Sequence, residues 1–202
     1  MSDSEHPNLL KDILLWNGLV KGSEKALEEL MRIHYKSLLN YGYKFFKDEE
    51  FLKDCLQDVF IEIWNRKTQI STPSNVKAYL LVSLRRRIFR NGRRQHLFED
   101  QVSSIENGNE AGIEFSPEWW LIEEESLALR TRRMADLLNT LPARQREVIY
   151  LKYYQDLSRE EISEMLSITP QTVSNILQIA YSFLRKHWNT AAISIILKLA
   201  LS

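Results

Sequence analysis

A basic stretch between residues 77 and 94 has the residue types needed to bind single-stranded DNA. It holds Lys77 and six arginines and no acidic residue. At 100° per residue in a helix, four side chains share one face: Tyr79, Arg86, Arg90 and Arg93. Bases stack on aromatic rings while guanidinium groups bind phosphates, so this face predicts contact with an unpaired strand. A solvated basic surface is the alternative.

The same helix must also have a side that packs into a core. We expect Leu80, Leu84 and Ile88 to form the buried stripe opposite the basic face, with Val82 and Phe89 beside the arginines. The loop before the helix carries hydroxyl and amide side chains that can donate hydrogen bonds: Thr68, Gln69, Ser71, Thr72 and Ser74.

A second candidate for DNA binding lies between residues 157 and 186. Ser158 and Glu161 have the spacing of a capping box, which predicts a helix from Arg159. After a tight turn at 167–169, Thr169-Pro170 is typical of a new helix start. Two short helices joined in this way match a helix-turn-helix.

The second of these helices carries polar side chains on its outward positions. Asparagine and glutamine pair bidentately with adenine in the major groove, and serine and threonine reach bases or phosphates. The outward positions, followed by two basic residues further along, are Gln171, Thr172, Ser174, Asn175, Gln178, Arg185 and Lys186. A plain helical hairpin with a polar surface is the competing interpretation.

Helices are expected through most of the chain, because apolar residues recur at helical spacing and glycine and proline are scarce. The predicted helices of the first half span residues 9–20, 24–46, 48–66 and 75–94. In the second half, further helices are predicted over 117–139 and 141–154, before the helix-turn-helix. The periodicity fails between residues 99 and 116, where we place a linker. The fold class is therefore all-α.

The zero net charge hides a strong segregation of charge. Residues 1–98 carry 17 basic and 12 acidic side chains, residues 99–125 carry 9 acidic and none basic, and residues 126–202 carry 10 basic and 6 acidic. Two basic blocks flanking an acidic one predict nucleic-acid contacts at both ends.

The composition also argues against several classes of protein. Cys55 is the only cysteine, which excludes an internal disulfide and fits a reducing cytoplasm. The start lacks the pattern of a signal peptide, and no stretch approaches the apolar length of a membrane span. The four histidines lie at no metal-ligand spacing, and no phosphate-binding glycine loop or nucleophile elbow occurs. We therefore expect no catalytic residue, metal or cofactor.

The segment Asp54–Trp64 resembles the polymerase-binding helix in domain two of bacterial sigma factors. That family's pattern is Asp-x-x-Gln-(Asp/Glu)-Val-Phe-x-x-(Leu/Ile)-Trp, and every patterned position is matched. The resemblance implies docking on the β′ clamp coiled coil of core RNA polymerase through Asp54, Gln57, Asp58, Glu62 and Trp64, while Val59, Phe60 and Ile63 pack inward. We expect Asp58→Arg to weaken this docking and to leave folding intact. An ordinary amphipathic helix with a solvated acidic face is the alternative.

Two further segments resemble the same family. Asn75–Leu80 is similar to the start of its minus-ten recognition helix, with Tyr79 where tryptophan is common; the preceding loop then captures a flipped base. Leu141–Val148 and the helix-turn-helix resemble domain four, which reads the minus-thirty-five element and contacts the β flap. The arginine-rich run and the absence of Lys or Arg at Ser174, Asn175 and Gln178 depart from the family.

The resemblance implies a sigma factor of the extracytoplasmic-function type. We predict domain two at 1–98, an acidic linker at 99–116, domain four at 117–188 and an apolar tail at 189–202. Its partners would be core polymerase, promoter DNA and an anti-sigma factor, which can be membrane-bound. The linker acids would imitate RNA phosphates in a basic channel, or the linker is a plain spacer. The tail would pack on domain four or bind the anti-sigma factor.

Two other functions stay open at this point. The helix-turn-helix also occurs in output domains of response regulators, so a stand-alone DNA-binding regulator is the main alternative. That interpretation leaves Asp54–Trp64 and the Tyr79/arginine face without a purpose. An enzyme is disfavoured by the absence of any recognisable catalytic constellation.

Overall fold

The computed structural model describes residues 6–94, 113–115 and 125–187, and within these ranges it contains helices and no strand. This agrees with the predicted all-α class. The chain divides into two compact units between Val102 and Ser103. The predicted domain boundaries at 98/99 and 116/117 stay predictions. Among the described residues, no helix has both the length and the apolar character that crossing a bilayer requires.

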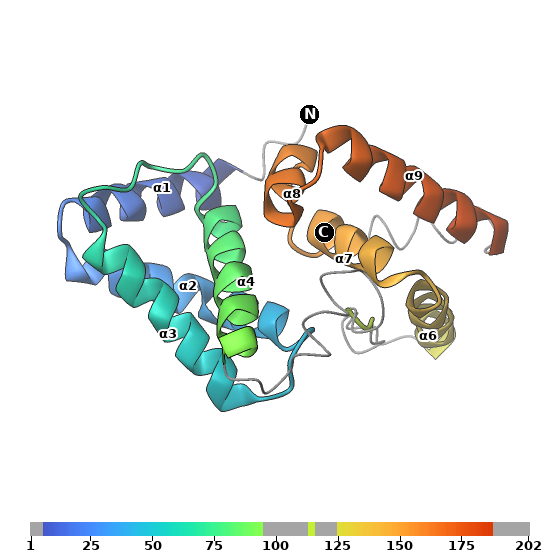
Figure 1. The fold of residues 1–202 in the computed structure, drawn as a ribbon. Helices are drawn as coiled ribbons and strands as arrows, with labels where there is room; N and C mark the ends of the chain where they lie inside the picture. Colours follow the sequence, from blue (N-terminus) through green and yellow to red (C-terminus); the bar gives the residue numbers. More distant parts are fainter. Residues whose placement is uncertain (1–5, 95–112, 116–124, 188–202) are drawn as a thin grey trace. The chain divides into compact units, whose positions relative to one another are not determined.

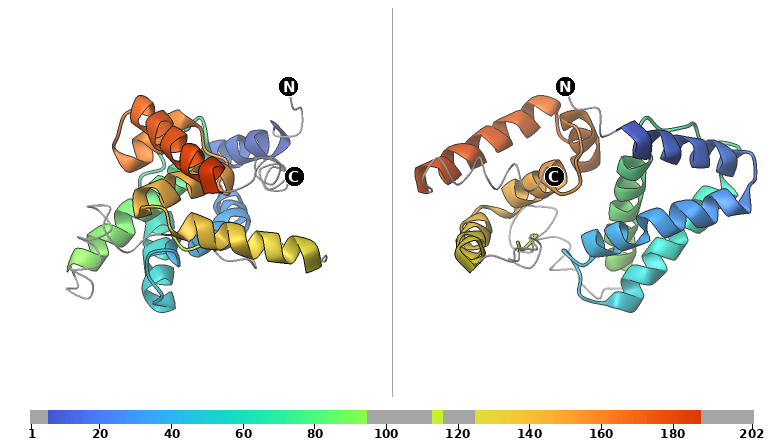
Figure 2. Two further views of the ribbon diagram at one scale, coloured as in Figure 1. Left: turned by 90° about the vertical axis from the view of Figure 1, so that its right-hand side faces the viewer. Right: turned by 180° about the vertical axis from the view of Figure 1, so that it is seen from behind.

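The first unit contains four helices: α1 (His6–Val20), α2 (Glu24–Gly42), α3 (Glu49–Asn65) and α4 (Val76–Arg94). α4 packs against each of the other three (Figures 1 and 2). Side chains at the starts of three helices bind backbone amides: Ser23 Oγ accepts from Ala26, Asp48 Oδ1 from Phe51, and Asn75 Oδ1 from Ala78. These caps satisfy N–H groups that the helix itself leaves unpaired.

The helix predicted over 24–46 ends earlier, at Gly42. A Cβ at Gly42 would lie 2.8 Å from Leu52 Cδ2, so the glycine permits α2 and α3 to approach closely. The following turn places Phe45 and Phe46 in the core, where both rings pack edge-on against Phe89. Burial of these two rings therefore overrides the local helical pattern.

The second unit contains α6 (Glu125–Asn139), α7 (Ala143–Tyr153), α8 (Arg159–Leu166) and α9 (Pro170–His187). α9 packs against α6, α7 and α8 (Figure 1). The part of the predicted 117–139 helix before residue 125 lies outside the described residues. Pro142 caps α7 and is not part of it, so this helix begins two residues later than predicted.

Candidate nucleic-acid interface

The basic face of α4 is narrower than the sequence predicted. Arg86, Arg90 and Arg93 are exposed, as expected for DNA-binding residues. Tyr79 is half-buried, because its ring packs edge-on against Trp16 with centroids 5.0 Å apart. Part of the Tyr79 ring is therefore in contact with the core, which restricts its position.

Val82 and Phe89, which the helical spacing places beside the arginines, do not share their exposure. Both are buried, and Leu80, Leu84 and Ile88 are buried as predicted. The reason is that α4 contacts three helices, so a wide arc of its circumference is covered. Phe89 is nevertheless close to a cation, since the Arg85 guanidinium carbon lies 4.6 Å from its ring centroid.

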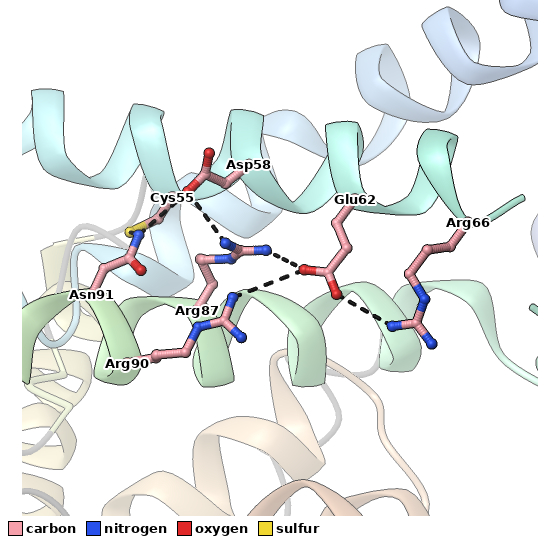
Figure 3. Close-up of polar contacts among 7 residues, drawn as sticks. All are labelled: Cys55, Asp58, Glu62, Arg66, Arg87, Arg90 and Asn91. Carbon is pink, nitrogen blue, oxygen red and sulfur yellow. Dashed lines mark hydrogen bonds and ion pairs between the residues drawn. The ribbon is translucent and has the colours of Figure 1, made fainter. Parts of the chain in front are cut away.

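An arginine in the middle of α4 connects this helix to α3. Arg87 Nη1 lies 3.4 Å from Asp58 Oδ2, and its Nη2 donates to Glu62 Oε2 (Figure 3). Asn91 Nδ2 also donates to Asp58 Oδ2 at 3.4 Å. The Arg87 side chain is only 16% exposed. It is therefore a crosslink between α3 and α4, and its guanidinium group is already occupied on both sides.

This crosslink changes the view of the predicted docking face on α3. Asp58 and Glu62 contact Arg87 on α4, whereas Asp54 and Gln57 are exposed. Ile61, which the sequence analysis missed, is 49% exposed on the same side as Asp54 and Gln57. The sequence offered one signal for Ile61, because this apolar residue stands at a helix position where the pattern predicts an exposed, polar side chain.

Two other expectations about α3 can be compared with the structure. Val59, Phe60 and Ile63 are buried, as predicted. Because Asp58 lies against Arg87, an arginine at position 58 would add a like charge beside it. The expectation that Asp58→Arg leaves folding intact therefore does not fit the observed contact, and Asp54 is the better position for such a test. Trp64 is half-buried, with Lys67 Nζ 4.1 Å from its ring centroid.

The loop between α3 and α4 leaves its candidate donors accessible. Thr68, Gln69, Ser71 and Ser74 are exposed. Thr72 is also exposed, and its hydroxyl donates to Asn17 Oδ1 at 2.8 Å, which ties the loop to α1. Lys77 is half-buried, and its charge makes a small contribution to lowering the pKa of His34.

One histidine has an acidic neighbour that sequence spacing did not reveal. His34 Nε2 lies 3.0 Å from Asp12 Oδ2, and both residues are buried between α1 and α2. Burial is the main cause that lowers the pKa of His34, and Asp12 partly opposes it. In the described part of the chain, no three His, Cys, Asp or Glu side chains gather as a metal site would require. Cys55 is buried, and burial raises its pKa to about 11, which favours the protonated thiol at neutral pH.

In the second unit, the helix-turn-helix is formed by α8 and α9. The predicted capping box is present: Ser158 Oγ accepts from Glu161 N, and Glu161 Oε2 accepts from Ser158 N. The turn passes through Ser167 in the left-handed conformation, at φ 54°. Arg144 on α7 donates to the carbonyl of Leu166 at 2.8 Å. The end of α8 is thus stabilised from outside the motif.

The predicted recognition residues of α9 occupy its outer surface. Gln171, Asn175, Gln178, Arg185 and Lys186 are exposed, and Thr172 and Ser174 are half-buried. Gln171 Nε2 donates to Asn175 Oδ1 at 3.0 Å, so one amide orients the other. Arg159 at the start of α8 donates to Ser174 Oγ at 3.4 Å and is exposed. Sequence analysis missed this arginine because it lies outside the recognition helix.

A short part of the predicted linker is attached to the second unit. Asn139 Oδ1 accepts from Phe115 N at 2.8 Å, and Asn139 Nδ2 donates to Phe115 O at 2.9 Å. The buried Phe115 ring also packs on Tyr154, with centroids 5.7 Å apart. Linker residues 99–112 and 116 and the apolar tail at 189–202 lie outside the described residues, so the predictions made for them stay predictions.

Comparison with protein-family models identifies both units. Residues 30–97 match the model for region 2 of sigma-70, and residues 131–184 match the model for region 4 of sigma-70. Together the matched segments cover more than half of the chain. The first includes most of α2 and all of α3 and α4, and the second includes all of α7 and α8 and most of α9.

Curated relatives match nearly the whole chain. It is 25% identical over 162 residues to RNA polymerase sigma factor YlaC of Bacillus subtilis, which covers 80% of this chain and 91% of that protein. It is 24% identical over 188 residues to the ECF RNA polymerase sigma factor SigK of Mycobacterium tuberculosis, which covers 89% of this chain and 95% of that protein.

Solved structures share the fold. CnrH in complex with the cytosolic domain of CnrY has a TM-score of 0.55 at 19% identity, covering 87% of this chain and 96% of that one. The sigma factor RpoE of Bartonella quintana, in complex with the anti-sigma factor NepR, has a TM-score of 0.53 at 20% identity, covering 80% and 96%.

Proposed function

Since this chain belongs to the sigma-70 family and is a sigma factor of the extracytoplasmic-function type, we propose that it binds core RNA polymerase through α3 and selects promoters through α4 and α9. It directs promoter recognition, DNA melting and transcription initiation. The single observation that carries this function is the presence of both sigma regions in one chain. Each region presents a helix with exposed side chains of the types that bind DNA.

For polymerase binding, the proposal centres on the exposed residues Asp54, Gln57 and Ile61 of α3. Asp54 and Gln57 would pair with polar and basic groups of the β′ clamp coiled coil, and the exposed Ile61 would supply apolar contact between them. Charge complementarity steers association, while a desolvated apolar residue near the centre of the contact contributes affinity. Trp64 lies at the end of the same helix and would border this contact.

For the minus-ten element, the proposal assigns DNA contacts to the exposed arginines of α4 and to the loop before it. Arg86, Arg90 and Arg93 would bind phosphates, and the half-buried Tyr79 would contact a base through the part of its ring that is accessible. Thr68, Gln69 and Ser71 are exposed in the loop and would donate hydrogen bonds to a flipped base. The half-buried Lys77 would contribute its positive charge to the attraction of the DNA phosphates.

For the minus-thirty-five element, α9 would lie in the major groove. Gln171 and Asn175, which are linked by a hydrogen bond, would read base edges near the start of the helix. Arg159 would contact a phosphate beside them, because the first helix of this motif crosses the DNA backbone. Arg185 and Lys186 would bind phosphates at the far end of α9.

Other partners and functions follow from the same premise. The stand-alone regulator is not favoured, because region 2 of sigma-70 accounts for α3 and α4. Sigma factors initiate transcription without being enzymes themselves. We also propose that the chain acts in the cytoplasm, where core polymerase is located, and that it binds an anti-sigma factor, as the structural relative RpoE does.

Run-off transcription with purified core polymerase tests this function. The chain plus core should give transcripts from a promoter library, and neither component alone should give them. A variant with Asp54→Arg should lose this activity at low concentrations of the chain. The proposal is overturned if the chain binds duplex DNA tightly by itself and gives no promoter-dependent transcript with core.

A further inference from the structure

Glu62 is an acceptor shared by three arginines at the border between α3 and α4. Its Oε2 binds Arg87 Nη2 and lies 3.9 Å from Arg90 Nη2, and its Oε1 lies 3.3 Å from Arg66 Nη1 (Figure 3). The Glu62 side chain is 43% exposed. The carboxylate therefore acts in contact with water, next to the arginines proposed to bind DNA.

The two α4 arginines at this carboxylate differ in how firmly they are held. Arg87 is 16% exposed and lies between Asp58 and Glu62, so two carboxylates fix its guanidinium group. Arg90 is 49% exposed, and its distance of 3.9 Å from Glu62 is longer than a hydrogen bond. Arg87 thus has a structural position, whereas Arg90 has a weak partner and access to the surface.

A phosphate is a stronger partner for Arg90 than Glu62 is. Guanidinium groups bind phosphates by parallel, charge-assisted hydrogen bonds, and release of counterions from DNA adds to the gain. An exposed carboxylate at 3.9 Å offers little in comparison. Arg90 can therefore leave Glu62 without breaking the contact between α3 and α4, because Arg87 maintains that contact.

We propose that Arg90 exchanges Glu62 for a phosphate of promoter DNA, and that Glu62 is a positioning residue that holds Arg90 back until DNA is bound. The proposal rests on the function proposed above. It assigns Glu62 to the control of DNA affinity, while the docking face for polymerase is formed by Asp54, Gln57 and Ile61. A phosphate has to displace this carboxylate, so Glu62 lowers the affinity of the α4 face for any nucleic acid.

The first experiment separates the position of the Glu62 carboxylate from its charge. Holoenzyme would be assembled with Glu62→Asp or Glu62→Gln, and its Kd for a fluorescent promoter fragment would be measured at fixed salt. Aspartate keeps the charge and is one methylene shorter, so it should release Arg90. Both variants should bind about 2- to 5-fold more tightly than the wild type. If Glu62→Asp bound DNA with wild-type affinity and only Glu62→Gln bound more tightly, net charge alone would explain the effect. This result would overturn the proposal.

A double-mutant cycle then tests whether the gain depends on Arg90. With Arg90→Gln in place, Glu62→Asp should no longer change the Kd, because no guanidinium group is left to release. Arg86→Gln is the matched control, since this exposed arginine lies on the same helix and is not among the three arginines described at Glu62. The effects of Arg86→Gln and Glu62→Asp should be additive. Coupling of equal size in both cycles would contradict the proposed exchange.

A further measurement leaves Glu62 untouched, in case its variants disturb the fold. The slope of log Kd against log salt for holoenzyme and promoter DNA should decrease by about one with Arg90→Gln, as expected when one phosphate contact is lost. An unchanged slope would show that Arg90 takes no phosphate and would overturn the inference. If wild-type holoenzyme bound no promoter at all, the proposed function itself would have failed, which is a separate outcome.

Discussion

The side chain of Asn139 should hold residues 113–115 on the second unit, and its removal should release them. Asn139→Ala deletes two hydrogen bonds to the Phe115 backbone, of 2.8 and 2.9 Å. At about 0.5–1.5 kcal/mol each, their loss should cost about 2 kcal/mol in the local opening of this segment. Arg146 donates to the backbone carbonyl of Asn139, so the end of α6 should stay in place.

Hydrogen exchange of the Phe115 amide measures this opening directly. A cost of about 2 kcal/mol corresponds to about 30-fold faster exchange in Asn139→Ala. In Asn139→Asp one carboxylate oxygen still accepts from the Phe115 N–H, but the other replaces the amide donor and faces the Phe115 carbonyl oxygen. This variant should also accelerate exchange, because one hydrogen bond is replaced by a repulsive contact. Amides of α3, which belongs to the first unit, serve as the internal reference.

The reasoning would be refuted by one clear result. If the Phe115 amide exchanged at the wild-type rate in Asn139→Ala, the two hydrogen bonds would contribute nothing to holding the segment. Its position would then depend on the buried rings, and Phe115→Ala, which removes the contact with Tyr154, should accelerate exchange instead.

Four further predictions follow from particular contacts. Phe60→Ala should lower the free energy of unfolding of the first unit by about 3–5 kcal/mol in urea denaturation, because this ring is buried; a loss below about 1 kcal/mol would contradict its assigned place in the core. Asp54→Arg should weaken binding to core polymerase at least 3-fold without changing the unfolding midpoint. Glu28→Arg, on the exposed surface of α2, should change neither the affinity nor the midpoint, and equal losses of affinity in the two variants would place the docking face elsewhere. Ser167→Gly should raise the free energy of unfolding of the second unit by about 0.5–1 kcal/mol, because residues with a side chain are strained in the left-handed conformation found here. A lower free energy of unfolding would mean that the turn is unstrained. Because burial lowers the pKa of His34, the folded state binds fewer protons than the unfolded state, so the free energy of unfolding should fall as pH decreases below about 6.5. This pH dependence should be smaller in His34→Gln, and equal slopes of unfolding free energy against pH in the two proteins would assign the effect to other groups.

Features that depend on local chemistry could be predicted from the sequence. The helix starts at Arg159 and Pro170 are set by the side chains directly before them, so the capping box and Thr169-Pro170 were sufficient. Gly22, at φ 91°, lies between α1 and α2, in the gap between the helices predicted over 9–20 and 24–46. The roles in polymerase and DNA binding were predicted from a match to family patterns. Single residues taken alone did not indicate these roles.

Features that depend on the neighbours of a helix could not be predicted. A helical wheel gives the angle of Phe89 around α4, but it does not give the number of helices that pack against α4. Phe89 is buried because three helices pack there. A helical wheel also cannot tell which side of α3 faces α4. The acids of α3 therefore looked equivalent, although Asp58 and Glu62 bind Arg87 and Asp54 is exposed.

The Arg87 crosslink has a consequence for building chimeric sigma factors. A designer who wants to change promoter preference would transplant Val76–Arg94 alone, because this helix carries the proposed minus-ten contacts. In a host without acids at the positions of Asp58 and Glu62, the transplanted Arg87 would lose both partners and would be left half-buried with its charge unpaired. The smallest transferable module is therefore the α3–α4 pair, and specificity for DNA has to be moved together with the helix that is proposed to bind polymerase.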